Sequence, residues 1–243
     1  MIRQLPLGIQ LRSGASFDSY LAGPNSQALA AVRACAAGSG EPFVHLWGRE
    51  GTGRTHLLQA ACRAAADSGR AAIYIPLEQT AEFTPEILDR LQRIDLVCLD
   101  DLQLVGGDAA WEQALFHLFN RLREHRTTLL TAADRAPARL PIALPDLRSR
   151  LGWGPCYRLH PLDDGQRQQW LIAAAAARGM QLPPETARYI LLRMPRDMNR
   201  LQALVETLDR SSLAAQRPLT VPFVRSVLAG LGELPTRPDP DTA

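Results

Sequence analysis

The chain carries a glycine-rich stretch, Gly48-Arg49-Glu50-Gly51-Thr52-Gly53-Arg54-Thr55, between an apolar run at Phe43–Trp47 and a helical pattern at Arg54–Ala66. The stretch has the form G-x-x-x-x-G-[K/R]-[S/T], with arginine in the place of the usual lysine. Its glycines let the backbone curl so that several N–H groups point into one concavity, and the start of the helix adds a positive dipole end. We therefore predict a phosphate-binding loop that holds a nucleotide, with Thr55 supplying a hydroxyl to Mg²⁺.

A second motif, Asp95-Leu96-Val97-Cys98-Leu99-Asp100-Asp101, is an apolar strand that ends in two carboxylates. Strands of a P-loop core bring such acids beside the phosphate loop, so Asp100 is expected as a ligand of Mg²⁺. Asp101 then occupies the place of a carboxylate that activates water, a catalytic role. A polar strand end without a ligand would explain one motif alone, but two motifs in this order favour a nucleotide site.

Around these motifs, short apolar runs alternate with longer helical patterns. The expected strands are Phe43–Trp47, Ala71–Ile75, Leu96–Leu99, Thr127–Thr131 and Cys156–Leu159. A helix is expected at Ala110–Arg123, with an apolar stripe of Leu115, Leu118, Phe119 and Leu122. The alternation predicts the α/β class: a P-loop core with a five-stranded parallel sheet and helices on both faces.

The strand pattern stops near Pro161. Helical spacing continues at Asp163–Arg178, Pro184–Arg193, Arg196–Ala214 and Val221–Leu228. We therefore expect an N-terminal arm at 1–15, the α/β nucleotide-binding core at 16–161, a small all-helical lid domain at 162–230 and a disordered, proline-rich tail at 231–243.

The charge balance excludes two classes of protein. The 27 basic and 25 acidic residues give a net charge of +2, unlike a polycationic nucleic-acid binder or a disordered acidic chain. Every basic residue is an arginine, and the half of the chain beyond Asn120 is the basic one. A single arginine therefore gains meaning only from the motif around it.

Cysteine spacing and hydropathy argue against a zinc-binding, a disulfide-rich, a secreted and a membrane-spanning protein. Cys35, Cys62, Cys98 and Cys156 are far apart in the sequence, so we expect buried thiols rather than a zinc site or a disulfide framework. The N-terminus lacks the pattern of a secretion signal, and no uninterrupted apolar stretch of about 18 residues occurs. A cytoplasmic protein without membrane contact is expected.

Several stretches together resemble the AAA+ module of the bacterial replication initiator DnaA. They are Asp95 to Gln103, Phe116-His117-Leu118-Phe119-Asn120, Leu130 to Pro137, Phe17-Asp18-Ser19-Tyr20-Leu21-Ala22-Gly23 and Ser149-Arg150-Leu151-Gly152-Trp153-Gly154. The resemblance covers about residues 16 to 230 and implies an AAA+ core that binds ADP or ATP with Mg²⁺, followed by a helical lid.

Two departures from DnaA narrow the resemblance. DnaA continues after its lid into a helix-turn-helix domain that binds DNA, whereas here a proline-rich tail follows Gly230. DnaA also carries a protein-interaction domain and a linker in front of its AAA+ module, whereas here a short arm precedes Phe17. This arm contains Gln4-Leu5-Pro6-Leu7-Gly8-Ile9, which is similar to peptides that dock on the DNA polymerase sliding clamp. Gln4 would reach backbone polar groups at the groove rim, while Leu5 and Leu7 would fill an apolar pocket.

The chain thus resembles the Hda-type regulators of the DnaA family. This resemblance implies an ADP-bound protein that docks on the sliding clamp, reaches DNA only through the clamp and triggers hydrolysis of DnaA-bound ATP. Re-initiation of chromosome replication would be repressed as a result.

The resemblance also implies roles for individual residues. Arg150 matches the arginine finger, which acts in trans on the nucleotide of a neighbouring subunit. Arg196 matches the sensor II arginine of the lid, with Arg200 one helical turn away as its rival. Asp134 matches the sensor I position, and an ordinary turn residue is equally expected there. The other expected nucleotide contacts are Gly48, Gly51, Thr52, Gly53, Arg54, Thr55, His56, Tyr20 and Leu21.

Arg54 has consequences for the chemistry. A lysine ammonium can follow charge between the β- and γ-phosphates, whereas a planar guanidinium is bulkier and prefers bidentate contacts. We therefore predict that the protein holds ADP as a stable ligand and hydrolyses ATP weakly or not at all. Its catalytic contribution would come mainly from Arg150 acting on DnaA.

Two other functions stay open. An ATP-hydrolysing remodeller such as a helicase loader fits less well with the arginine in the phosphate loop and with the clamp-like peptide. A DnaA-like initiator or adaptor that binds DNA directly would use the basic second half, with salt-sensitive and sequence-independent affinity. Self-association into a homo-oligomer is also open.

Overall fold

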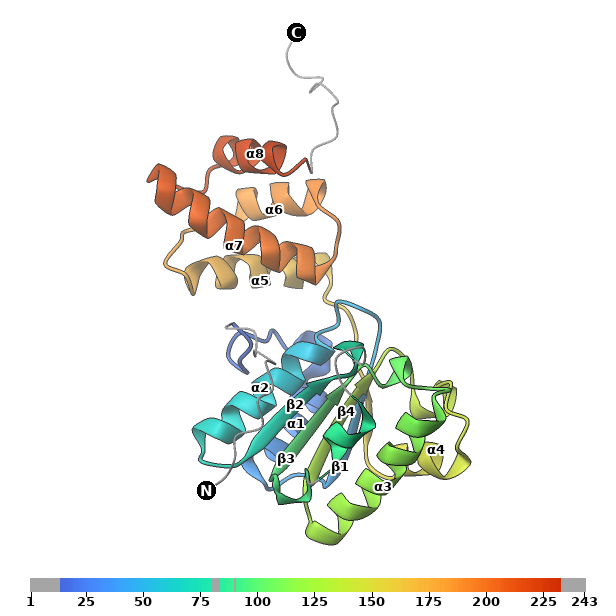
Figure 1. Cartoon of the computed structure of the whole chain (residues 1–243). Helices are drawn as coiled ribbons and strands as arrows, with labels where there is room; N and C mark the ends of the chain where they lie inside the picture. Colours follow the sequence, from blue (N-terminus) through green and yellow to red (C-terminus); the bar gives the residue numbers. More distant parts are fainter. Residues whose placement is uncertain (1–13, 80–83, 90, 233–243) are drawn as a thin grey trace. The chain divides into compact units, whose positions relative to one another are not determined.

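The computed structural model describes residues 14–79, 84–89 and 91–232. The chain divides after Pro161 into two compact units, each with its own hydrophobic core (Figure 1). The clamp-like residues Gln4, Leu5 and Leu7 and the tail from residue 233 lie outside the described residues.

The first unit is built on five parallel strands. They are β1 (Phe43–Trp47), β2 (Ala72–Pro76), β3 (Leu96–Asp100), β4 (Thr128–Ala133) and β5 (Cys156–Arg158). Their order in the sheet is β2-β3-β4-β1-β5, and every neighbouring pair is parallel. The predicted five-stranded parallel sheet is therefore confirmed, and each predicted run holds a strand.

Helices cover both faces of this sheet (Figure 1). On one face, α1 (Ser26–Ala37) and α2 (Arg54–Asp67) pack on alternate residues of β1, β3 and β4. On the other face, α3 (Ala109–His125) and α4 (Pro145–Leu151) pack on the remaining residues. Side chains of successive strand residues point to opposite faces of the sheet. A strand that is buried along its whole length therefore contributes side chains to the hydrophobic cores on both faces.

Two core helices, α1 and α4, have no counterpart among the predicted elements. The buried face of α1 consists of the small residues Ala28, Val32, Cys35 and Ala36, which contrast weakly with its alanine-rich exposed face. The helix α4 has seven residues and begins with a proline in its first turn. Both helices are stabilised mainly by tertiary packing, because short or low-contrast segments carry little helical signal of their own.

Short 3₁₀ turns connect these elements. They lie at Gly23–Asn25, Leu77–Gln79, Pro85–Leu88, Leu91–Arg93, Leu102–Leu104 and Pro137–Arg139. Cys35, Cys62 and Cys98 are buried as predicted, but Cys156 is exposed. The prediction for Cys156 is wrong because β5 is the edge strand of the sheet, so the residue has a neighbouring strand on one side only.

The second unit is all-helical. It contains α5 (Asp164–Ala176), α6 (Pro184–Arg193), α7 (Met198–Ala215) and α8 (Val221–Gly230), which share one apolar core. Asp163 and Gln166 form a reciprocal capping box at the start of α5, and the carboxylate of Asp197 caps α7. The helix α7 therefore begins at Met198, two residues later than predicted, and Arg196 lies just outside it.

In the described parts of the chain, no helix is both long enough and apolar enough to cross a membrane.

Candidate functional site

The glycine-rich loop joins the end of β1 to the first turn of α2. Gly51 and Gly53 have left-handed backbone angles, with φ of 75° and 91°. A Cβ atom on Gly48 would lie 2.7 Å from the carbonyl oxygen of Leu159. Thr52 tightens the turn by donating its hydroxyl to the carbonyl oxygen of Arg49 at 2.7 Å. The bends of the loop thus require glycine, as in a backbone nest for phosphate.

Tyr20 packs directly on this loop. A Cβ on Gly53 would lie 2.6 Å from Cε2 of the Tyr20 ring, and the Tyr20 hydroxyl donates to the carbonyl oxygen of Thr52 at 3.5 Å. Burial raises the pKa of Tyr20 to about 12. Leu21 is half-buried next to it. The structure brings Tyr20 to the loop. Contact of Tyr20 and Leu21 with adenine stays a prediction.

His56, predicted to contact the nucleotide, binds the segment before Tyr20. Its Nε2 lies 2.8 Å from the carbonyl oxygen of Ser16 and 3.3 Å from Oγ of Ser19. Its ring centroid is 5.5 Å from that of Tyr20. Asn25 fixes the chain a few residues after Tyr20. Its side-chain amide donates a hydrogen bond of 2.9 Å to the carbonyl oxygen of His160 and accepts one of 2.8 Å from the backbone N–H of His160. The structure thus gives His56 a role in fixing residues 16–20 against the loop.

Thr55 and Asp100, the two residues predicted to bind Mg²⁺, meet at one edge of the loop. The Asp100 side chain is 1% exposed and hydrogen-bonds the side chain of Thr55. It also accepts a hydrogen bond of 3.0 Å from the Tyr74 hydroxyl and one of 3.0 Å from its neighbour's backbone N–H. Burial, and then the charge of Asp101, raise the pKa of the Asp100 carboxyl. A divalent cation at this edge would favour its ionised form.

Arg54 and Asp101 form an ion pair next to this edge. NH2 of Arg54 donates to Oδ1 of Asp101 at 3.2 Å, and the two side chains are 11% and 19% exposed. Oδ1 also accepts from Nε2 of Gln103 at 2.8 Å. The Oε1 atom of Gln103 in turn accepts from the backbone N–H of Asp134 at 3.0 Å. A chain of polar contacts therefore runs from the phosphate loop past the end of β3 to the end of β4.

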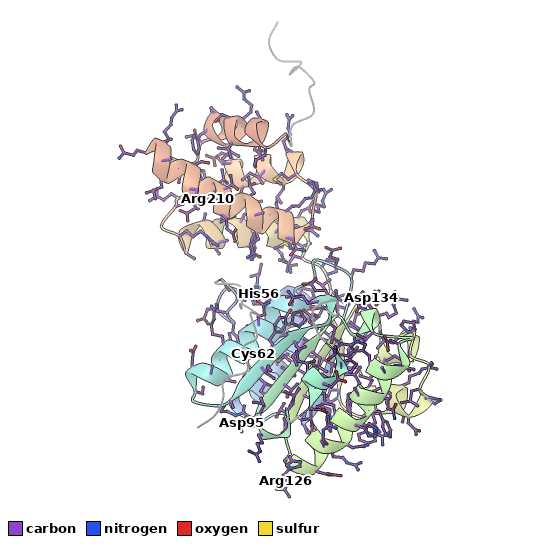
Figure 2. All side chains as sticks on the ribbon, viewed as in Figure 1. His56, Cys62, Asp95, Arg126, Asp134 and Arg210 are labelled. Atoms are coloured by element: carbon purple, nitrogen blue, oxygen red, sulfur yellow. The ribbon has the colours of Figure 1, made fainter. Side chains whose placement is uncertain are left out.

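The Asp134 carboxylate itself points to another partner. It takes a bidentate pair from Arg135, at 2.7 Å from Nε and 2.6 Å from NH2, and this contact lowers the pKa of Asp134. Figure 2 shows His56 and Asp134 at one end of the core, with Asp95 and Arg126 at the other. The phosphate loop, the pair Asp100 and Asp101, and Asp134 lie at the carboxyl ends of β1, β3 and β4, respectively, where open α/β folds bind ligands.

The site fits the diphosphate of ADP or ATP. NH1 of Arg54 is buried and has no hydrogen-bond partner among the described residues. A buried cationic donor of this kind is seldom left unsatisfied, and a phosphate oxygen would complete it. Thr55 and Asp100 would hold Mg²⁺, which takes hard oxygen ligands and usually binds through a few protein oxygens, phosphates and water.

Arg150 lies on a separate platform made by α3 and α4. Its guanidinium stacks 3.9 Å above the Phe116 ring centroid and 5.1 Å from that of Trp153. Nε donates to Oδ1 of Asn120 at 3.1 Å, and NH1 donates to the carbonyl oxygen of Asp146 at 3.2 Å. In the described part of the chain, Arg150 makes no hydrogen bond to the phosphate loop. The structure therefore does not bring Arg150 together with Arg54, Asp100 and Asp101.

Glu112 joins the two helices of this platform. Its side chain is on α3, is 3% exposed, and accepts hydrogen bonds from the backbone N–H groups of Gly107, Ala143 and Leu144 at 2.7, 2.9 and 2.7 Å. Residues 143 and 144 lead directly into α4. Burial alone would raise the pKa of Glu112, but the three donors hold it below its ordinary value. The carboxylate thus fixes the start of the helix that bears Arg150.

Arg196, in the helical unit, is paired with a carboxylate of the same unit. It donates from Nε and NH2 to the two oxygens of Asp164, with two distances of 2.8 Å. Asp164 also accepts from Arg167 at 2.8 Å. The hydrogen bond from Arg196 is the main reason that the pKa of Asp164 falls to about 2. A role of Arg196 at the phosphates therefore requires that it exchange Asp164 for the nucleotide.

Two residues of these networks were not expected from the sequence. Gln103 lies two residues after Asp101, and the signal that could have found it is an amide so close to the acidic strand end. Glu112 lies three residues before Leu115 on the apolar stripe of α3, and a charge on such a stripe is itself a signal of a buried, hydrogen-bonded group.

Comparisons with known families match both units. The family described as the bacterial DnaA ATPase domain matches residues 11–157, which is more than half of the chain. The family described as the Hda lid domain matches residues 164–228.

Solved structures share the fold. Domain III of the Thermotoga maritima initiator DnaA has a TM-score of 0.76 at 21% identity, covering 91% of this chain and 98% of that one. AMPPCP-bound DnaA from Aquifex aeolicus has a TM-score of 0.69 at 24% identity, covering 82% and 66%. The Thermotoga maritima RuvB branch migration motor has a TM-score of 0.65 at 18% identity, covering 91% and 74%. The fold is thus that of AAA+ proteins.

Proposed function

This chain belongs to the family of bacterial DnaA ATPase domains, and from that premise we propose that it is an ADP-binding regulator of replication initiation. Docked on the DNA sliding clamp in the cytoplasm, it stimulates hydrolysis of DnaA-bound ATP through Arg150 and so represses re-initiation of chromosome replication. The match of the second unit to the Hda lid family supports this assignment within the DnaA family.

The position of Arg150 is the observation that most supports this proposal. Its guanidinium is fixed by Phe116, Asn120 and Asp146 on a platform apart from the residues that line the chain's own phosphate loop. An arginine finger has to be presented to the nucleotide of another subunit, where it neutralises charge that develops on the γ-phosphate. Preordered contacts of this kind lower the cost of aligning the side chain when the partner docks.

The chain's own site would hold the nucleotide rather than consume it. The loop backbone and Arg54 would bind the phosphates of ADP, Thr55 and Asp100 would hold Mg²⁺, and Tyr20 and Leu21 would lie near the base. Mg²⁺, when bound, neutralises phosphate charge. Arg54 in the lysine position would keep intrinsic hydrolysis weak, since a guanidinium does not follow the transferring phosphate as an ammonium does.

The decisive experiment measures hydrolysis by DnaA. DnaA is loaded with labelled ATP and mixed with clamp on DNA, ADP and this protein, and the conversion to ADP is followed. We expect stimulation by the unmodified protein and a loss of at least about a hundredfold with Arg150→Ala, as for other arginine fingers. Arg139→Ala, an exposed arginine of the same unit, is the control for loss of charge. No stimulation by the unmodified protein would refute the proposal.

Clamp docking is tested separately, on immobilised clamp. We expect retention of the unmodified protein and loss of retention when Gln4 and Leu5 are both changed to alanine, because one amide and one apolar anchor are removed. Retention that survives this double change would place the contact elsewhere on the chain. Rapid ATP turnover by the purified protein alone would favour the helicase-loader alternative instead.

A further inference from the structure

Only part of the Arg54 guanidinium has a bonding partner among the described residues. NH2 is 3.2 Å from Oδ1 of Asp101, whereas NH1 is buried and has no hydrogen-bond partner among the described residues. A guanidinium presents donors along separate edges of a rigid plane, so one edge can keep a carboxylate while another takes a second anion. A lysine ammonium in the same position would be a single point charge shared between both anions.

Asp101 is held in place for this contact from two further sides. Nε2 of Gln103 donates to the same Oδ1 at 2.8 Å, and the backbone N–H of Asp101 donates to Oδ1 of Asp100 at 3.0 Å. Its backbone is in the left-handed region, with φ of 57° and ψ of 48°, which aspartate and asparagine tolerate better than most residues. The carboxylate therefore stays beside Arg54 without help from a ligand.

We propose that Arg54 binds two anions at the same time. Its NH2 group stays paired with the Asp101 carboxylate, while its NH1 group donates a hydrogen bond to a phosphate oxygen of a bound nucleoside diphosphate. Asp101, the carboxylate placed to activate water, then remains an ion-pair partner while the nucleotide is bound. With arginine at this position, the site binds ADP stably and does not promote hydrolysis of ATP. Gln103 is the positioning residue that fixes Asp101 in the ion pair with Arg54. The inference rests on the proposed ADP-bound regulator and gives a reason for its weak hydrolysis.

A double-mutant cycle on ADP affinity tests this division. The dissociation constant of ADP is measured by calorimetry for the unmodified protein, Asp101→Asn, Arg54→Lys and the double variant. Asparagine suits the left-handed backbone and still accepts from Gln103, so the fold should be preserved, and thermal unfolding checks it.

In the arginine background, Asp101→Asn should change the dissociation constant by less than about twofold, because each anion has its own edge of the guanidinium. In the lysine background, Asp101→Asn should tighten ADP binding by about fivefold, since the carboxylate and the phosphates then compete for one ammonium, at the strength of a partly exposed ion pair. Equal tightening in both backgrounds, or no effect in either, would overturn the proposal.

Turnover of ATP by the purified protein gives the second readout. Arg54→Lys should raise it by at least about tenfold, because Asp101 loses its own edge of the guanidinium and is released whenever the phosphates take the ammonium. Asp101→Asn should remove that gain, since the released carboxylate is the group that activates water. A gain that survives Asp101→Asn would also contradict the assignment. Both measurements need neither DnaA nor clamp, so their failure is distinct from failure of the regulatory function.

Discussion

The amide of Gln103 faces two different groups, and only an amide satisfies both. Its nitrogen donates to the Asp101 carboxylate, and its oxygen accepts from the backbone N–H of Asp134. A carboxylate in its place would face Asp101 with like charge, and an apolar side chain would leave both partners without this contact. The orientation of the amide is therefore set by its neighbours.

Substitutions of Gln103 should separate these two effects. Gln103→Met should lower the free energy of unfolding by about 1–3 kcal/mol, because it removes two hydrogen bonds and leaves a backbone donor unsatisfied. Gln103→Glu should lower the free energy of unfolding more at pH 7 than at pH 5, since protonation of one carboxyl relieves the repulsion with Asp101. Denaturant unfolding at both pH values measures this.

Gln113→Met, on the exposed side of α3, is the matched control and should change stability little. If Gln103→Glu lost the same free energy at both pH values, the carboxylates would not be in contact, and the hydrogen-bond geometry at Asp101 would be wrong.

At the scale of elements, α3 and α4 act as one platform. Glu112 ties the backbone before α4 to α3, and Phe116 and Asn120 of α3 hold Arg150 of α4. The stripe of α3 is predicted from its spacing, but α4 is too short for periodicity to reveal it. The position of Arg150 thus depends on a helix that only packing stabilises.

Glu112→Gln should loosen this platform. We expect a loss of about 2–3 kcal/mol in the free energy of unfolding, because an amide cannot match a buried carboxylate that accepts three N–H groups. The loss should depend on pH. The pKa of Glu112 is lowered in the folded chain, so its contribution is present above its ordinary value of 4.5 and disappears as the pH falls through the lowered value.

Urea unfolding between pH 3 and pH 7 checks this prediction, with Glu124→Gln on the exposed end of α3 as the control. A difference between the unmodified protein and Glu112→Gln that stays constant down to pH 3 would show that ionisation of Glu112 does not contribute. Stimulation of DnaA should fall along with stability, because Arg150 loses its fixed support.

At the scale of the whole molecule, each of the two units has a hydrophobic core of its own. Asp164 holds Arg196 within the helical unit through a bidentate pair. For Arg196 to act as sensor II, this pair has to exchange for contact with the phosphates. The sensor II role predicted for Arg196 thus implies that Asp164 would compete with the nucleotide for this arginine.

Asp164→Asn should then bind ADP more tightly, by about two- to threefold, because an exposed ion pair is a weak competitor. The dissociation constant of ADP measures this, and Glu185→Gln, which removes one exposed charge from the same unit, is the control. The effect should be absent in the Arg196→Ala background. Unchanged affinity in Asp164→Asn would argue for Arg200, the rival, as the phosphate-sensing arginine.

The amino-acid sequence by itself determined the α/β class, the five strands, the helical second unit, and the order of the phosphate loop and the acidic strand end. These features are local: glycine spacing, apolar periodicity and motif order report them directly. Tertiary structure alone decided which side chain meets which. It placed Asp101 on Arg54, His56 on the segment before Tyr20, and Arg150 on α3, because these contacts join residues far apart in the chain, where no local pattern specifies a partner.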